Sequence, residues 1–161
     1  MLRIARKLKD VTSPAVLALT LALCAPASAA EKVEVLSVTA SSTDGMLMDA
    51  VDGDATTAWQ NKREGDRDAW LAVHFSQSAK IKGVRLLMDP LGADTQIEIE
   101  TSSDGETYNA MLRNQHATKT TPFDLVFKAP VNALYLRVRF HYAGKATAPR
   151  FRIKELDPLG G

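Results

Sequence analysis

The sequence predicts an all-β fold, a sandwich or barrel of antiparallel strands. Apolar and polar side chains alternate with a period of two in successive runs, the pattern of a strand with one buried face. These runs are separated by stretches of Gly, Pro, Asn, Asp and Ser, which favour turns. No long helical pattern lies between them, so an all-β architecture is expected.

The alternation is strongest in "LYLRVRF" at 134–140, where the even-numbered residues are all apolar. Tyr135, Arg137 and Arg139 lie on the opposite face of this run. In "WLAVHF" at 70–75, the odd-numbered residues form the apolar face. The predicted strands, in chain order, are 32–38, 70–75, 81–88, 97–101, 107–112, 123–127, 134–140 and 151–156.

Two stretches predict local structure between the strands. "SSDGET" at 102–107 predicts a hairpin, because an Asp-Gly pair suits a turn that needs a positive φ. "DGMLMDAVDG" at 44–53 is the one stretch expected to form a short helical turn.

The direction of the strands predicts which loops share an end of the sandwich. If every connection reverses the chain, the loop at 49–57 falls at one end, beside the finish of the last strand at Glu155. We call residues 49–57 the Asp loop. The loops expected at the other end are 60–68, 89–95, 113–122 and 141–149.

The first thirty residues have the pattern of a secretory signal peptide. Four basic residues come first, an apolar run follows at 14–25, and small residues at 27–30 suit a cleavage site. A lipoprotein signal acylated at Cys24 is the alternative, although Leu23 stands where a small residue is usual. We therefore expect an exported protein, periplasmic or secreted, with one domain at 31–161.

The charge and cysteine content narrow the possible functions. Removal of residues 1–30 takes away four basic residues and one acidic residue, so the net charge changes from +1 to about −2. No basic excess is then present for binding nucleic acid. The only cysteine, Cys24, is lost as well, so neither a disulfide nor thiol chemistry is expected. No later apolar stretch is long enough for a membrane-spanning helix.

The Asp loop contains "AVDGDATTAW" at 50–59 and allows two interpretations. Asp52, Asp54 and Thr57 offer the oxygen ligands that calcium prefers, and Gly53 permits the chain to curl around an ion. The spacing is not that of an EF-hand loop. From the composition alone, an Asp-Gly turn followed by a capping threonine is the simpler interpretation.

The order of several motifs along the chain resembles the discoidin domain, also called the coagulation factor V/VIII C-type domain. This family belongs to the galactose-binding-like superfamily and includes carbohydrate-binding modules of secreted bacterial proteins. The resemblance implies a jelly-roll β-sandwich of about eight antiparallel strands. The motifs are "AVDGDATTAW", "WLAVHFSQSAKIKGVRLL", "IEIETSSDGETY", "LYLRVRF" and "FRIKELD", in that order across residues 50–157.

The resemblance also implies a structural calcium ion and assigns its ligands. Many bacterial members bind calcium through oxygens that match Asp52, Asp54, Thr57 and Glu155 in this sequence. The tryptophan equivalent to Trp59 mostly packs in the core of family members. We assign Trp70 to the core as well.

The loops opposite the Asp loop are the expected ligand site. The histidine and arginine common in galactose-binding members are absent here, since Gln60 and the pair Met88–Asp89 occupy those places. Other planar or polar side chains in these loops are able to bind a glycan. The ligand-binding candidates are Asn61, Arg63, Arg67, His116, His141 and Tyr142.

The predicted function is that of an exported, non-catalytic binding module that recognises a glycan or a cell-envelope polysaccharide. No nucleophile, phosphate-binding or metal-histidine motif appears in the sequence. The alternative is a module that assembles envelope proteins and binds no sugar. Tyr142 is the only Phe, Tyr or Trp in the expected ligand loops, and a glycan site normally needs such an aromatic platform.

Overall fold

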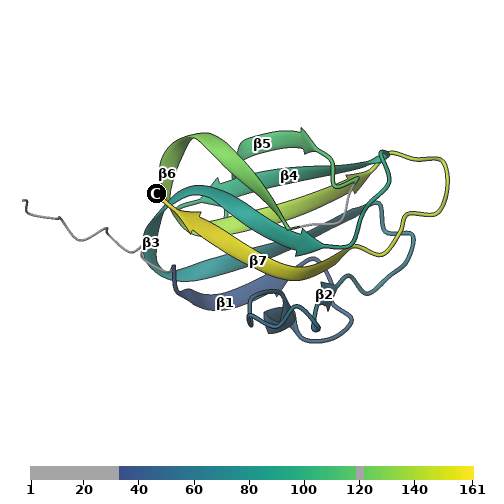
Figure 1. The fold of residues 1–161 in the computed structure, drawn as a ribbon, viewed down its shortest axis with the longest axis horizontal. Coiled ribbons are helices and arrows are strands. Elements are labelled where there is room, and N and C mark those ends of the chain that lie inside the picture. The colour runs from purple at the N-terminus through teal and green to yellow at the C-terminus, as the bar shows by residue number, and fades with distance from the viewer. Residues whose placement is uncertain (1–32, 119–121) are drawn as a thin grey trace, which may run out of the picture.

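The computed structural model describes residues 33–118 and 122–161, and these residues form an all-β antiparallel sandwich (Figure 1). The predicted fold class is therefore confirmed. The predicted signal peptide at 1–30, with Cys24, lies outside the described residues. The elements are β1 (Val35–Ala40), the 3-10 helix η1 (Leu47–Ala50), β2 (Trp59–Gln60), β3 (Asp68–Met88), β4 (Thr95–Ser102), β5 (Asn109–Gln115), β6 (Phe123–Tyr142) and β7 (Arg152–Gly160).

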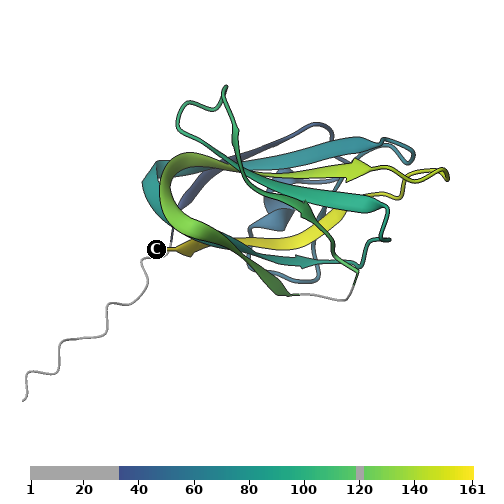
Figure 2. The same ribbon diagram turned by 90° about the horizontal axis from the view of Figure 1, so that it is seen from above.

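One continuous sheet builds both layers, in the order β2-β7-β3-β6-β4-β5 with β1 paired to β3. The first layer contains β1, β4, β5 and the halves of β3 and β6 at 68–75 and 134–142. The second layer contains β2, β7 and the other halves of β3 and β6. In Figure 2 the β6 ribbon turns around one end of the molecule and passes from one layer to the other.

Four predicted strands are joined in pairs in the structure. The runs 70–75 and 81–88 both belong to β3, and 123–127 and 134–140 both belong to β6. The β3–β6 register shifts between His74 and Ala79 and again between Ile81 and Gly83, where the strands bend. A Cβ at Gly83 would collide with the Leu125 carbonyl oxygen, so the bend requires glycine. The two joins reduce the eight predicted strands to six, and the short strand β2, which was not predicted, brings the total in the described chain to seven.

The core lies between the two layers and is formed by the apolar faces that the alternation predicts. Leu71, Val73 and Phe75 are buried, and Trp59 is fully buried as expected. Trp59 stacks on Phe140 with ring centroids 6.4 Å apart. The assignment of Trp70 to the core is wrong, because Trp70 alternates with Leu71 and lies partly exposed on the outer face of the first layer.

The two predicted local structures are also present. The 102–107 turn joins β4 to β5, with Gly105 at a φ of 79°. The Asp104 carboxylate accepts hydrogen bonds from the main-chain N–H groups of Glu106 and Thr107, both at 2.9 Å, and these bonds lower the pKa of Asp104. The predicted helical turn is η1.

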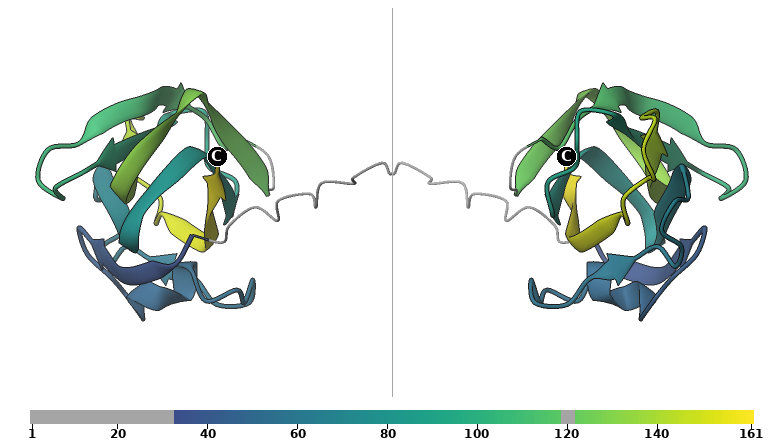
Figure 3. Two further views of the ribbon diagram at one scale, coloured as in Figure 1. Left: turned by 90° about the vertical axis from the view of Figure 1, so that its left-hand side faces the viewer. Right: turned by 90° about the vertical axis from the view of Figure 1, so that its right-hand side faces the viewer.

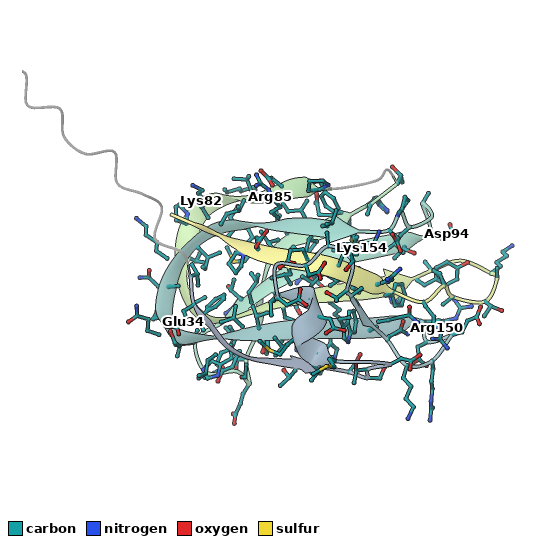
Figure 4. All side chains as sticks on the ribbon, turned by 60° about the horizontal axis from the view of Figure 1, so that its bottom comes forward. Glu34, Lys82, Arg85, Asp94, Arg150 and Lys154 are labelled. Carbon is teal, nitrogen blue, oxygen red and sulfur yellow. The ribbon has the colours of Figure 1, made fainter. Side chains whose placement is uncertain are left out.

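The described residues of the four predicted ligand loops meet at one end of the sandwich, which we call the loop end. Figure 4 places Asp94 and Arg150 at this end, and Glu34 and Lys82 at the opposite one. Main-chain hydrogen bonds tie the loops together. These bonds run from Tyr142 N to Arg67 O, from Ala143 N to Asp94 O, from Leu91 N to Ala117 O and from Gly65 N to Ala148 O.

The Asp loop lies beside Glu155 as predicted, because the Gly53 N–H donates to Glu155 Oε2 at 3.1 Å. Its predicted place at the finish of the last strand is wrong. β7 continues to Gly160, so Glu155 lies near the start of the strand and opposite Leu87. End-on views show β1, η1 and β2 along one side of the sandwich (Figure 3).

Within residues 33–118 and 122–161, no helix is long and apolar enough to cross a membrane.

Candidate functional site

A pocket of about 260 Å³ opens on the outer face of the first layer, next to the loop end. We call it the loop-end pocket. Its wall contains carboxylates, guanidiniums, amides and an imidazole, contributed by four neighbouring strands. The lining residues are Asp68, Gln96, Glu98, Arg113, Asn114, Arg139 and His141.

The strand register brings these side chains together. His141 lies opposite both Asp68 on β3 and Gln96 on β4. Two residues further along the same face, Arg139 lies opposite Glu98. Side chains of alternate residues point to the same side of a sheet, so these positions form two adjacent outward rows.

Charges in the pocket are paired and balanced. The Arg113 guanidinium lies 3.2 Å from the Glu98 carboxylate. Asp68 Oδ1 lies 3.0 Å from His141 Nδ1 and 3.8 Å from Arg139 Nη2. A wall with both donors and acceptors, and with no large excess of either charge, matches hydroxyl groups, which also both donate and accept.

A β-bulge in edge strand β5 aims two residues at the pocket. Ile97 pairs with Gln115 and Ile99 pairs with Leu112, so Arg113 and Asn114 together oppose the single residue Glu98. Asn114 is the one non-glycine residue with a positive φ in the described chain, at 56°. Bulges and left-handed residues of this kind redirect side chains and are frequent beside binding sites.

Of the six predicted ligand residues, only His141 lines the pocket. His116 lies nearby, where its Nδ1 contacts the Thr95 carbonyl oxygen at 2.9 Å. Arg67 is held at the loop end by hydrogen bonds from its Nη1 to the carbonyl oxygens of Tyr142 and Gly144, at 3.3 and 2.7 Å. Arg63 is exposed in its loop and is not part of the pocket wall.

Two other predicted ligand residues are buried and have structural roles. Asn61 is fully buried, and its side chain donates to the Arg63 carbonyl at 2.8 Å and accepts from the Phe151 N–H at 2.7 Å. Tyr142 is only 8% exposed and packs against Arg67, whose guanidinium lies 5.6 Å from the ring centroid. Asn61 therefore presents no surface to a ligand, and Tyr142 presents little.

The other six pocket residues are not among the predicted ligand residues. Asp68, Arg113 and Asn114 fall within or at the edge of the searched loops but were not selected. Gln96, Glu98 and Arg139 were missed because they lie on strands outside those loops. A signal for Arg139 was present. The alternation in 134–140 places it on the face opposite the core, where a half-buried strand exposes its polar side chains.

The Asp loop forms a separate cluster of oxygen atoms around Thr57. Thr57 Oγ1 lies 2.9 Å from Asp52 Oδ2, 2.8 Å from the Asp54 carbonyl oxygen and 3.4 Å from the Asp49 carbonyl oxygen. A hydroxyl has a single proton, so it donates fully to only one of these three acceptors. The remaining close oxygen contacts suit a cation, and the donor set is the hard, all-oxygen type that calcium prefers.

The Asp54 carboxylate does not face this cluster. Its Oδ1 accepts from the Thr56 hydroxyl at 2.7 Å and from the Thr56 N–H at 2.9 Å, and these bonds lower the pKa of Asp54. Asp54 therefore offers its main-chain carbonyl oxygen to the cluster instead of its side chain. Among residues 33–118 and 122–161, no three His, Cys, Asp or Glu side chains gather as metal ligands. An ion at this loop would thus need main-chain and hydroxyl oxygens.

The comparisons with known proteins identify the family and the fold. The family model described as "F5/8 type C domain" matches residues 37–151, so the chain belongs to the F5/8 type C (discoidin) domain family. The resemblance seen in the sequence is therefore confirmed. No curated protein sequence matches the chain.

Several solved structures share the fold. Chitosan-binding module 1 from a chitosanase/glucanase of Paenibacillus sp. IK-5 is 22% identical with a TM-score of 0.67, and the match covers 80% of this chain and 97% of that one. A pectin-binding carbohydrate-binding module is 20% identical with a TM-score of 0.61, covering 78% and 91%. The family 32 module of NanJ from C. perfringens, in complex with galactose, is 19% identical with a TM-score of 0.62, covering 76% and 91%.

Proposed function

We propose that this domain is a glycan-binding module and that the loop-end pocket is its sugar site. The observation that supports this most strongly is the convergence of paired guanidinium, carboxylate, amide and imidazole groups in one pocket of a carbohydrate-binding-module fold. Binding requires only that these groups hydrogen-bond to sugar hydroxyls, so no catalytic step is involved. A cell-envelope polysaccharide is the natural ligand of a module that is exported, as the N-terminal pattern indicates.

The solved relatives support a glycan rather than a particular sugar. Their descriptions name pectin, chitosan and galactose as ligands. The balanced charge of the pocket favours a neutral sugar over a polyanion or a polycation, since Asp68 and Glu98 each face a cationic group.

A glycan array followed by calorimetry tests this proposal, with Arg139→Ala as the key variant. We expect at least one glycan to bind the wild type and Arg139→Ala to lower its affinity by about tenfold or more, since a charged pocket donor is lost. Arg85→Ala is the matched control. Arg85 also projects outward from the sheet and pairs with Asp124 at 2.7 Å, but it lies in the second layer.

Unchanged binding in Arg139→Ala would contradict the assignment of the pocket. If the wild type binds no glycan on the array but retains an envelope protein in a pull-down, the domain is an assembly module instead.

We also propose that the Asp loop binds a structural calcium ion. Asp52, Thr57, Glu155 and the carbonyl oxygens of Asp49 and Asp54 would hold it, and calcium would supply only a fixed positive charge that pins the loop to β7. The oxygen crowding around Thr57 supports this proposal. A bound ion would stabilise an exported domain in which no disulfide is expected.

Calcium is expected to raise the Tm of the protein relative to EDTA. An ion that binds only the folded state, present at about 100 times its Kd, adds about 2.7 kcal/mol to the free energy of unfolding, which corresponds to about 5–10 °C. Thermal melts in EDTA and in millimolar calcium measure the shift. Asp52→Ala should abolish it, whereas Asp49→Asn, which keeps the main-chain carbonyl, should preserve it. Equal midpoints in EDTA and calcium would refute the calcium site.

A further inference from the structure

Beyond the loop-end pocket, the outer face of the first layer continues as a surface of planar side chains. Trp70 lies opposite Arg139 in the strand register, so this surface begins where the pocket wall ends. Each of its rings is partly exposed. We call this surface the planar row, and it consists of Trp70, His74, Tyr108, Tyr135 and Arg137.

Arg137 is fixed in the middle of the planar row. Its guanidinium carbon lies 3.7 Å from the Tyr108 ring centroid and 5.8 Å from the Trp70 ring centroid. Its Nε donates to Glu100 Oε2 at 2.5 Å, and Glu100 is itself buried. This buried, charge-assisted bond holds the three planar groups in one arrangement before any ligand arrives.

The far end of the planar row is a stacked pair. The His74 and Tyr135 rings lie opposite each other on β3 and β6, with centroids 4.3 Å apart and an interplanar angle of 7°. From this pair to the pocket, Tyr135, Arg137, Arg139 and His141 occupy alternate positions of β6. Alternate residues of a strand are about 7 Å apart, so the outward side chains form a continuous track from the pocket toward the bend of the sheet.

We propose that the planar row is a second part of the glycan site, which binds further sugar units of the chain whose first unit occupies the pocket. This proposal rests on the glycan-binding function proposed above and adds that the ligand is an extended polysaccharide segment rather than a single terminal sugar. His74 and Tyr135 cover one face of each other. Arg137 covers one face of Tyr108. A further sugar unit would therefore use the Trp70 ring and the other faces and rims of these rings, since flat apolar faces with polar rims suit the apolar faces of pyranose rings.

The position of the face favours a glycan over a protein partner. The exposed large apolar residues in the described chain are Leu36, Met46, Met48 and Val126. Leu36 lies on β1, and the other three lie outside the first layer, so the described part of this layer has one exposed large apolar residue. Rings and arginine are common in protein interfaces as well, so it is the continuity of this face with the polar loop-end pocket that favours a glycan.

The dependence of affinity on chain length tests the proposal. Calorimetry would use three series from mono- to hexasaccharide, derived from galactan, from polygalacturonic acid and from chitosan. We expect the wild type to bind at least one series with an affinity that rises by about tenfold or more with length. Trp70→Ala should remove this rise and leave the monosaccharide affinity unchanged, whereas Arg139→Ala should weaken every length.

Two further variants keep the test decisive. Trp70→Tyr retains a ring and should preserve most of the rise of affinity with chain length. If Trp70→Ala fails to fold, Tyr135→Ala replaces it and should reduce this rise for the longer oligosaccharides. A wild-type affinity that does not rise with length, but is lost in Arg139→Ala, would overturn the planar row and leave the pocket intact. If no length of any series binds the wild type, both the planar row and the glycan function are contradicted.

Discussion

Replacement of Trp59 by alanine is expected to remove about 3–5 kcal/mol of stability, the range measured when a buried Trp or Phe is truncated. Trp59 is fully buried, stacks on Phe140, and donates its indole N–H to the Ser42 carbonyl at 3.1 Å. The truncation opens a large cavity and leaves this partly buried carbonyl without its partner. Since a domain of this size is stable by only about 5–15 kcal/mol, the variant should be close to unfolding at room temperature.

Urea denaturation followed by circular dichroism measures this effect. Trp59→Phe is the control, because it keeps most of the ring volume and should lose much less stability. A loss of under about 1 kcal/mol in Trp59→Ala would show that Trp59 is not part of the core, as that value is typical of surface positions.

Replacement of Asn61 by alanine should be the next most damaging change, even though Asn61 lies in a loop. Its side chain accepts the Phe151 N–H, and Phe151 is fully buried, so the alanine variant leaves a buried donor without a partner. Such a group costs about 1–3 kcal/mol. The side-chain link between the 60–68 loop and Phe151 would be lost, while the main-chain bond from the Asn61 N–H to the Phe151 carbonyl at 3.2 Å would remain.

The measurement is the same urea titration, with Asn132→Ala as the control. Asn132 is an exposed asparagine on β6, and its truncation should change the free energy of unfolding by less than about 0.5 kcal/mol. Equal stabilities of the Asn61 and Asn132 variants would contradict the structural role of Asn61.

The strands and the core were predictable because apolar and polar residues alternate along a strand that has one buried and one exposed face. Leu136 and Val138 are buried as this pattern predicts. The long bent strands were not predictable from it. The residues at the bend of β3 interrupt the alternation, and whether a strand ends or bends there depends on its pairing with β6, about fifty residues away along the chain.

The candidate site was predictable only in part because its residues meet through strand pairing and burial. Asn61 has the chemistry of a ligand residue, but its partner Phe151 is 90 residues away, and only the fold brings the two together. The pocket residues Arg113 and Asn114 oppose Glu98 because of a β-bulge in β5. No residue pattern in the sequence predicts this bulge. By contrast, the contact between the Asp loop and Glu155 was expected from the family resemblance, and it is present, although the strand directions placed it at the wrong end of β7.

The two tryptophans provide the most direct test of the glycan site. The chain has only Trp59 and Trp70, so a ¹⁵N spectrum of the folded protein should have two indole N–H signals. Trp59 is fully buried, and Trp70 lies beside the pocket on the partly exposed outer face. We expect saturation with a glycan that binds on the array to shift the Trp70 signal and leave the Trp59 signal in place, and Arg139→Ala to abolish the shift. A glycan that binds but leaves the Trp70 signal unmoved would contradict the assignment of sugar binding to this face.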